Sequence, residues 1–348
     1  MFVVDASRAL LNGTTRILLG FDLLFQLCIH VAQGHLSLSA ARLFGASCLL
    51  AIKKDSGGVR PIAVGEALYR LVARSLSFQF RATFSNHFEP WQFGVATRGG
   101  CETIVHGLRA TLDLHPDWVV LQLDIRNAFN IVSREAIFRE LRSVPGTLDP
   151  LFPFVRSFYS QSSPLYFSMG TRTGDISTLL LEVGTRQGDP LGGALFALGH
   201  LRALRATVPQ HPDCIFPSYA DDTHIVGPFD QVLLAFHTLQ DQLASVGLTI
   251  QPTKCIAWSP HGLPPSLSLP EDFRVSTTRL CILGAPLGPD SFVQTYAVET
   301  LQEALQSLHD LPLLVDPQLM EILIELCLGY WRRYSGQVPF LLRMDALQ

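Results

Sequence analysis

Two adjacent carboxylates between strand-like runs are the feature that most constrains how this chain can fold. In residues 215–226, apolar and β-branched residues flank Tyr219, Ala220, Asp221 and Asp222 on both sides. This pattern predicts a β-hairpin that carries both acids near its turn. Like charges held this close repel each other, and a divalent cation would remove that repulsion. An ordinary Asp-Asp turn is the simpler alternative, because aspartate is common in turns, and the tetrapeptide alone does not decide between them.

A third acid favours the cation site. Asp124 directly follows residues 118–123, whose strongly apolar run predicts a buried strand. A solvated charge is unexpected at the end of such a strand unless it has a ligand. Three carboxylates can bind two hard cations through oxygen. Two such ions, about 3.5–4 Å apart, suit phosphoryl transfer to a 3′-hydroxyl with loss of pyrophosphate.

Several further segments resemble motifs of one enzyme family, the reverse transcriptases of the non-LTR retrotransposon (LINE-like) type. The motifs follow the family's order over residues 20–290, and the chain's three lysines, Lys53, Lys54 and Lys254, all fall inside them. The matching segments are residues 53–62 (the fingers motif), 124–130 (the first catalytic motif), 186–191 (the QGDP motif), 219–222 (the catalytic hairpin), 247–254 (the lysine-bearing motif) and 283–284 (the primer grip).

The resemblance implies catalytic roles for particular residues. Asp124, Asp221 and Asp222 would hold two Mg²⁺ ions, for which Mn²⁺ could substitute, and Ile125 would add its backbone carbonyl. Lys254 would donate a proton to the leaving pyrophosphate. A surface lysine in a loop is the equal alternative for Lys254.

The resemblance also implies a nucleotide site. Lys53 and Arg60 would hold the triphosphate from a hairpin, because phosphate is bound by point charges and bidentate donors. Phe129 would exclude a 2′-hydroxyl and so select deoxynucleotides. Gln187 would contact the sugar, and Gly188 would let the backbone approach closely. Read without the other motifs, Lys53 is a solvated turn residue and Phe129 a core aromatic.

The order of the expected elements is α+β, with an antiparallel centre. Apolar runs and turn residues predict a strand–turn–strand over residues 49–64 and a hairpin within 166–183. Helices are expected at 66–84, after a cap at Ser133, and in the tail, with a break at 312–317. The resemblance implies a right-hand polymerase with palm and fingers, an antiparallel palm sheet and a partial helical thumb. The expected divisions are an N-terminal helical extension at 1–48, fingers at 49–117, a palm at 118–290 with some interleaved fingers elements, and a thumb-like tail at 291–348. Residues 17–32 are expected to form a buried helix, since polar residues interrupt the run and no membrane span is predicted.

Charge and cysteine content give weaker constraints. The formal net charge is −4, but residues 42–109 carry nine basic and four acidic residues, so this half could face phosphates. The seven cysteines are scattered, without zinc-site spacing. They suggest reduced core cysteines in an intracellular protein of the nucleus or cytoplasm.

The expected function is that of an RNA-directed DNA polymerase. It would extend a DNA or RNA primer on an RNA template with dNTPs; the oligomeric state is not constrained. Two alternatives remain open. An RNA-dependent RNA polymerase shares the palm, although it usually has glycine where Ala220 stands and a small polar residue where Phe129 stands. An inactive or domesticated retroelement fragment would bind nucleic acid without turnover.

Overall fold

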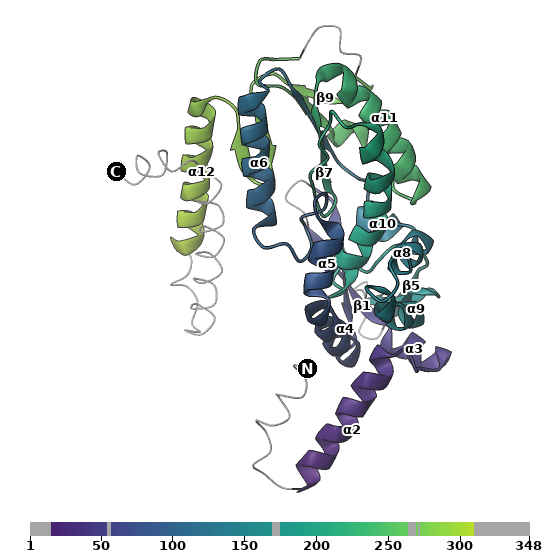
Figure 1. The fold of residues 1–348 in the computed structure, drawn as a ribbon. Helices are drawn as coiled ribbons and strands as arrows, with labels where there is room; N and C mark the ends of the chain where they lie inside the picture. The colour runs from purple at the N-terminus through teal and green to yellow at the C-terminus, as the bar shows by residue number, and fades with distance from the viewer. Residues whose placement is uncertain (1–14, 54–56, 169–174, 264–268, 271, 310–348) are drawn as a thin grey trace. The chain divides into compact units, whose positions relative to one another are not determined.

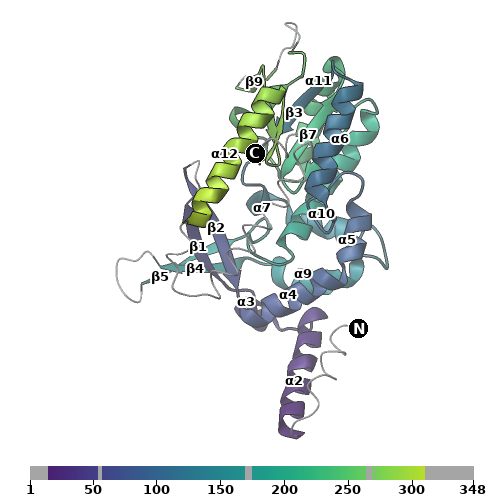
Figure 2. The same ribbon diagram turned by 90° about the vertical axis from the view of Figure 1, so that its left-hand side faces the viewer.

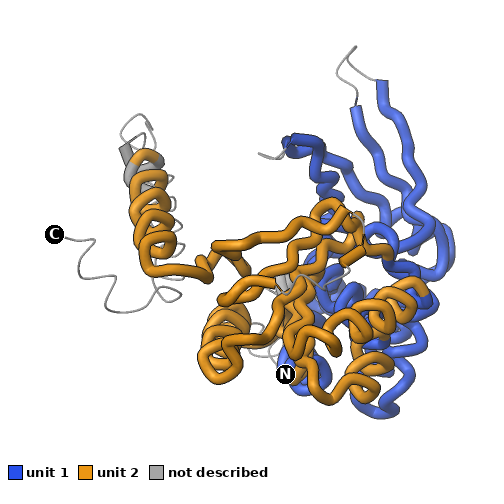
Figure 3. The backbone as a smooth tube through the Cα atoms, turned by 90° about the horizontal axis from the view of Figure 1, so that it is seen from above, with its two compact units in different colours: residues 1–88, 127–202, 245–248 blue, residues 89–126, 203–244, 249–348 orange. Residues whose placement is uncertain are grey.

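The chain divides into two compact units, each assembled from several chain segments (Figure 3). The computed structural model describes residues 15–53, 57–168, 175–263, 269–270 and 272–309. Unit 1 comprises residues 1–88, 127–202 and 245–248, and unit 2 comprises residues 89–126, 203–244 and 249–348. The units therefore interleave along the chain, whereas the sequence predicted four consecutive divisions, which stay a prediction.

Unit 1 is built on a four-stranded sheet in the order β2-β1-β4-β5 (Figure 2). The strands pair antiparallel except for the short parallel contact of β1 with β4. The elements are α2 (Thr15–Ala32), α3 (Leu38–Phe44), β1 (Ser47–Lys53), β2 (Val59–Gly65), α4 (Ala67–Gln79), α5 (Arg81–Phe88), α7 (Ala128–Ile131), α8 (Arg134–Leu141), α9 (Phe152–Tyr159), β4 (Ser163–Ser168), β5 (Ile176–Leu181) and most of α10 (Gly192–Thr207).

The two predicted hairpins of unit 1 are confirmed. β1 and β2 form the strand–turn–strand expected around residues 49–64, and β4 and β5 form the hairpin expected within 166–183. Pro61 lies opposite Ala51 in β2, which is an edge strand. Proline is tolerated there because an edge strand leaves one side without ladder hydrogen bonds. The remaining edge of β2 is thus open to other backbone partners.

The helix predicted at 17–32 forms, but the prediction that it is buried is wrong. In α2, Leu23, Leu24 and Leu27 are 64%, 45% and 38% exposed, and among residues 20–32, whose burial is described, only Val31 is fully buried. No described helix is both long and apolar enough to cross a bilayer.

Unit 2 is built on a five-stranded sheet in the order β6-β7-β3-β8-β9. All pairs are antiparallel except β8–β9, so the predicted antiparallel sheet gains one parallel strand that the sequence did not indicate. The elements are α6 (Gly100–Leu114), β3 (Val119–Leu123), the end of α10, β6 (Ser218–Tyr219), β7 (Asp222–Gly227), α11 (Phe229–Ser245), β8 (Ile256–Trp258), β9 (Arg274–Ser276), β10 (Leu280–Ile282), β11 (Ala285–Leu287) and α12 (Asp290–His309).

The core of unit 2 explains why β3 reads as a continuous apolar run. Figure 1 shows α6 on one side of the sheet and α11 on the other. Val120, Val226 and Trp258 are paired across three strands and form one cluster with Ile104 and Leu108 of α6. Because both faces of the central strand are covered, every apolar side chain of β3 is buried.

The helices fall near their predicted positions. Ser133 caps α8, its hydroxyl accepting a hydrogen bond from the Ala136 N–H at 3.3 Å, as predicted. The helix expected at 66–84 is interrupted at Phe80, where α4 ends and α5 begins. The thumb-like tail is described only as α12, and its expected break at 312–317 lies outside the described residues.

The prediction of core cysteines holds for only part of the set. Cys214 and Cys255 are buried, but Cys48 and Cys281 are exposed, and all the described cysteines are free thiols. Cys48 lies in β1, most of whose residues face solvent, and Cys281 lies in β10 between two buried residues.

Arg134 ties α8 to the β4–β5 hairpin and generates a stability prediction. Its buried guanidinium donates to the carbonyls of Gly184 (2.9 Å), Gln161 (2.8 Å) and Leu181 (3.0 Å). We expect Arg134→Met to lower the free energy of unfolding by about 3 kcal/mol, because it leaves buried carbonyls without donors. Urea denaturation measures this change.

The control lies on the same helix. Arg139 pairs with Glu135, and both side chains are largely exposed. Arg139→Met should change the free energy of unfolding by less than about 0.5 kcal/mol. Equal losses in the two variants would show that the buried carbonyls are not what Arg134 stabilises.

Candidate active site

The backbone around Asp124 is fixed at the rim of the five-stranded sheet. Asp124 follows the last residue of β3, and its carbonyl accepts from the Gln251 N–H at 2.9 Å. Arg126 N–H donates to the Thr249 carbonyl at 2.9 Å, and Ile125 bridges Ile250. Ile125 itself is buried. The strand end is therefore anchored, although the Asp124 side chain is still 38% exposed.

The predicted hairpin carries the other two acids, as expected. β6 and β7 pair Ser218 with Thr223 and Tyr219 with Asp222, which leaves Ala220 and Asp221 in the turn. β7 also pairs with β3, with Thr223 opposite Leu123. One step further along both strands, Asp222 therefore stands across from Asp124. The strand register, not sequence proximity, brings these carboxylates together.

The three acids share one electrostatic environment. Partial desolvation, and then the negative charges of Asp221 and Asp124, raise the pKa of Asp222 to about 6. The residue as a whole remains open to solvent. A raised pKa means that the charged form of Asp222 is disfavoured where it stands. The rim thus gathers negative charge that the protein does not fully neutralise.

Lys254 supplies part of the missing positive charge. A short 3₁₀ helix, Pro252–Lys254, sets it beside the strand end, with its Nζ atom 3.6 Å from Oδ1 of Asp124. Its side chain is half exposed. An exposed pair of this kind is weak in itself. Lys254 is consequently available to a ligand at the rim.

The donor set fits a hard divalent cation without forming a closed cage. Within the described parts of the chain, no group of three histidine, cysteine, aspartate or glutamate side chains is gathered tightly enough to hold a metal ion. Carboxylate oxygens are nevertheless the ligands that Mg²⁺ prefers. Mg²⁺ is usually bound by one or two carboxylates together with waters and substrate phosphates. One or two of the carboxylates of Asp124, Asp221 and Asp222 would suffice for a site of that kind.

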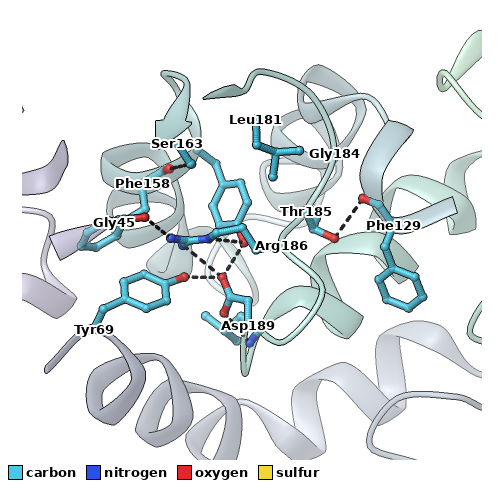
Figure 4. A network of polar contacts seen from close by, with 12 residues as sticks. Gly45, Tyr69, Phe129, Phe158, Ser163, Leu181, Gly184, Thr185, Arg186 and Asp189 are labelled. Carbon is cyan, nitrogen blue, oxygen red and sulfur yellow. Dashed lines mark hydrogen bonds and ion pairs between the residues drawn. The ribbon is translucent and has the colours of Figure 1, made fainter. Parts of the chain in front are cut away.

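In unit 1, a buried ionic network holds the turn that carries Gln187 and Gly188 (Figure 4). The Arg186 Nη2 atom lies 3.1 Å from Oδ2 of Asp189, and both side chains are 1% exposed. Tyr69 and Tyr159 also donate to Asp189, and their rings lie 4.3 and 5.0 Å from the guanidinium carbon. Burial raises the pKa of both phenols, which keeps them as donors.

The turn that carries Gln187 and Gly188 lies against the edge of β2. Ala63 N–H donates to the Gln187 carbonyl at 2.7 Å. At Gly188, whose φ is +112°, a Cβ atom would stand 2.8 Å from the Ala63 oxygen and 3.2 Å from Ile62 Cγ2. Both the backbone angle and the lack of space require glycine here, as the sequence predicted for a close backbone approach.

The hairpin register separates the two predicted phosphate ligands. Lys53 pairs with Val59 and Arg60 with Ile52, so Lys53 and Arg60 belong to opposite faces of the sheet. Arg60 shares its face with Ile62, whose Cγ2 atom is close to Gly188. Both cations are exposed.

The side chain of Phe129 is neither fully buried in the core nor fully exposed to solvent. Its ring stacks on Phe196, with centroids 4.7 Å apart, and the residue is half-buried. Its carbonyl accepts from the Thr185 N–H at 2.6 Å, which joins it to the segment before Arg186. Phe129 and the Gln187 turn are thereby linked within unit 1.

The comparison with protein families decides the class. The family described as "Reverse transcriptase (RNA-dependent DNA polymerase)" matches residues 52–288. The chain belongs to the reverse transcriptase family. The α+β palm-and-fingers fold predicted from its motifs is confirmed.

A curated relative agrees with the retrotransposon type. The chain is 26% identical over 220 residues to the retrotransposable element SLACS 132 kDa protein of Trypanosoma brucei gambiense. The match covers 63% of this chain but only 18% of that protein. The chain thus spans about a fifth of the length of the relative.

Solved telomerases share the fold. A truncated apo telomerase from Candida tropicalis superposes with a TM-score of 0.51 at 11% identity, covering 70% of this chain and 53% of that one. A Candida albicans telomerase in complex with a TWJ fragment of telomeric RNA gives 0.52 at 12% identity, covering 72% and 45%. At such identities the likeness shows the fold alone.

One buried residue at the rim was not identified from the sequence. Gln92 is 0% exposed and contacts the turn of the catalytic-motif hairpin. No apolar periodicity marks a single glutamine in a loop. A polar residue flanked by Trp91, Phe93 and Gly94 was the available signal. Its meaning depends on a chain pairing that only the tertiary structure shows.

The charge crowding at the rim predicts an unusual stability change. In metal-free protein, Asp222→Asn removes one of three repelling charges, so we expect the melting temperature to rise by roughly 2 °C. Millimolar Mg²⁺ should then stabilise the wild type more than this variant. Differential scanning calorimetry with and without Mg²⁺ measures both effects.

Asp241→Asn is the matched control. Asp241 is exposed on α11, so its replacement should leave the Mg²⁺-dependent shift as in the wild type. A lower melting temperature for metal-free Asp222→Asn would contradict the repulsion.

Proposed function

We propose that this chain is the polymerase core of a non-LTR retrotransposon reverse transcriptase. It extends the 3′ end of a DNA or RNA primer on an RNA template, using dNTPs. The observation that carries the proposal is the register of β3 and β7, which sets Asp124 across from Asp222 beside Asp221. The family match supports the reaction class, and the SLACS relative supports the retrotransposon setting.

The rim acids are the proposed metal ligands. Asp124, Asp221 and Asp222, with the Ile125 carbonyl, would hold two Mg²⁺ ions, or Mn²⁺ in their place. Such ions lower the pKa of an attacking hydroxyl and neutralise charge on a leaving group. The open donor set leaves room for the triphosphate oxygens. The chain's own contribution is to hold three carboxylates in fixed directions before the substrate arrives.

Lys254 is the proposed proton donor to pyrophosphate. Its Nζ atom lies at the same rim as the acids and is half exposed, so a leaving group could reach it. A general acid must stand within hydrogen-bond reach of the group it protonates. The alternative of an unrelated surface lysine is disfavoured by its 3.6 Å approach to Asp124.

The nucleotide site is proposed in unit 1. Arg60 lies on the same face of β2 as Ile62, whose Cγ2 atom is close to Gly188, so its guanidinium suits bidentate binding of the triphosphate there. Lys53 would act from the opposite face. Gln187 and Gly188, held by the Arg186–Asp189 ion pair, would contact the sugar. The proposed divisions are an N-terminal helical extension at 1–48, fingers at 49–117, a palm at 118–290 and a thumb-like tail at 291–348.

Loss of a rim carboxylate tests the proposed reaction. Asp124→Asn keeps the size of the side chain but removes its charge. We expect primer extension with Mg²⁺ and dTTP on poly(rA)/oligo(dT) to fall by about 10³-fold, equivalent to about 4 kcal/mol. Far-UV circular dichroism should show an intact fold.

The same assay separates the alternatives. Asp241→Asn should extend like the wild type. If the wild type incorporated NTPs instead of dNTPs, an RNA polymerase would be the better assignment. If it bound the primer–template without extension in Mg²⁺ or Mn²⁺, the chain would be a binding fragment.

Replacement of Phe129 tests sugar selection. Phe129→Ala removes the ring that would clash with a 2′-hydroxyl, so ribonucleotide incorporation should rise by at least about tenfold relative to dNTPs. Steady-state incorporation of dTTP and UTP measures the ratio. Phe129→Tyr keeps the ring and its stacking on Phe196, and should keep the selectivity. Unchanged discrimination in Phe129→Ala would remove Phe129 from the sugar site.

A further inference from the structure

The turn of the catalytic-motif hairpin is held by one buried side chain. The Ala220 N–H donates to Oε1 of Gln92 at 2.7 Å, and Nε2 of Gln92 donates to the Ala220 carbonyl at 2.9 Å. The same Oε1 atom accepts from the Gly94 N–H at 2.9 Å. One amide group therefore satisfies both backbone groups of the residue that precedes Asp221.

The hairpin needs such a support. β6 has two residues and lies at the edge of the sheet, so few ladder hydrogen bonds hold it. Ala220 adopts a φ of +53°, a left-handed conformation that alanine rarely takes without external constraint. This backbone angle sets the directions in which Asp221 and Asp222 leave the turn. Without a restraint, the turn would relax toward other conformations.

Residues 91–94 form the platform for Gln92. Ser218 N–H donates to the Trp91 carbonyl at 2.9 Å, and Phe93 N–H donates to the Ser218 carbonyl at 2.8 Å. This segment thus lies along the free edge of β6. A Cβ atom on Gly94 would stand 2.1 Å from the Ala220 nitrogen. The close approach that glycine permits brings the Gln92 amide into reach of the turn.

We propose that Gln92 is a positioning residue for Asp221 and Asp222. By fixing Ala220 in the left-handed conformation, it pre-orients the two carboxylates toward Asp124. This inference rests on the proposed polymerase function of the rim. It assigns the task to glutamine because the site requires a donor and an acceptor on one planar group, at the reach of a three-carbon side chain.

Substitutions at Gln92 separate these requirements. Gln92→Met keeps the length and loses both hydrogen-bonding groups. Gln92→Glu keeps the shape and the acceptor but cannot donate to the Ala220 carbonyl when ionised. It also adds a negative charge near Asp221. Neither variant touches the nucleotide residues of unit 1.

We expect kcat of Gln92→Met to fall by about 10²-fold while KM for dTTP stays within about twofold, because small misplacement of reacting groups lowers the rate and not nucleotide binding. The Mg²⁺ concentration at half-maximal rate should increase several-fold. Gln240→Met, at an exposed position on α11, is the control and should match the wild type in each constant.

Rescue tests whether Gln92 acts through Ala220. Glycine takes a positive φ without strain, so Gln92→Met combined with Ala220→Gly should recover about tenfold of the lost kcat. A defect caused only by loss of packing around Gln92 would not be recovered by a change at the turn. Failure of the double variant to exceed Gln92→Met would therefore overturn the proposed route.

Two measurements do not depend on turnover. Hydrogen exchange of the Ala220 amide should be at least tenfold faster in Gln92→Met than in the wild type. Mn²⁺ binding to the protein without nucleic acid, followed by electron paramagnetic resonance, should weaken several-fold. Unchanged exchange and unchanged Mn²⁺ affinity would overturn the inference even if activity fell.

These experiments test the polymerase function and the positioning role of Gln92 separately. If the wild type extends no primer, the polymerase proposal fails, whereas exchange and Mn²⁺ binding still decide the role of Gln92. If Gln92→Met does not fold, Gln92→Glu is the deciding variant. A Gln92→Glu protein with wild-type kcat and Mn²⁺ affinity would show that the donated hydrogen bond does not position the carboxylates.

Discussion

Repulsion among three carboxylates at the rim of the five-stranded sheet is the interaction on which the rest of the site depends. The β3–β7 register brings Asp124 opposite Asp222, and the turn adds Asp221. Desolvation and the two neighbouring charges raise the pKa of Asp222 to about 6. A fold that holds charges together against repulsion must anchor each backbone segment. The anchors are the hydrogen bond of Gln251 to Asp124 and the contacts of Gln92 with Ala220.

In unit 1, by contrast, buried charges of opposite sign neutralise each other. Arg186 and Asp189 are both buried, and they compensate each other with help from two tyrosines. Breaking a buried pair is strongly destabilising, whereas the pair itself is weak evidence for net stability. Its consequence here is shape, because the ion pair fixes the turn that presents Gln187 and Gly188 to β2. A compensated network therefore positions the proposed nucleotide residues, and an uncompensated cluster forms the proposed metal site.

For several predicted site residues, the structure bears on whether a purely structural role would explain them. Phe129 stacks on Phe196 on one side, so its packing role and its proposed gating role coexist. Lys254 approaches a rim carboxylate, which a random surface lysine would not be expected to do. Lys53 and Arg60, which the motif pairs, lie on opposite faces of their hairpin, and only Arg60 shares the face of Ile62, which is close to Gly188. The strand register thus distinguishes residues that the motif treats alike.

The sequence by itself determined the family, the α+β class, the two hairpins of unit 1 and the rim acids. These features depend on local pattern: apolar runs that end on Asp124, the Asp221-Asp222 pair, and a turn sequence that requires Gly188. The tertiary structure decided which strands became neighbours, the parallel strand β9, the exposure of Leu23 on α2, and the role of Gln92. These depend on contacts between segments distant in the chain, such as the 128 residues that separate Gln92 from Ala220. No local pattern encodes such a pairing, because its free energy arises only when the sheet edge has formed.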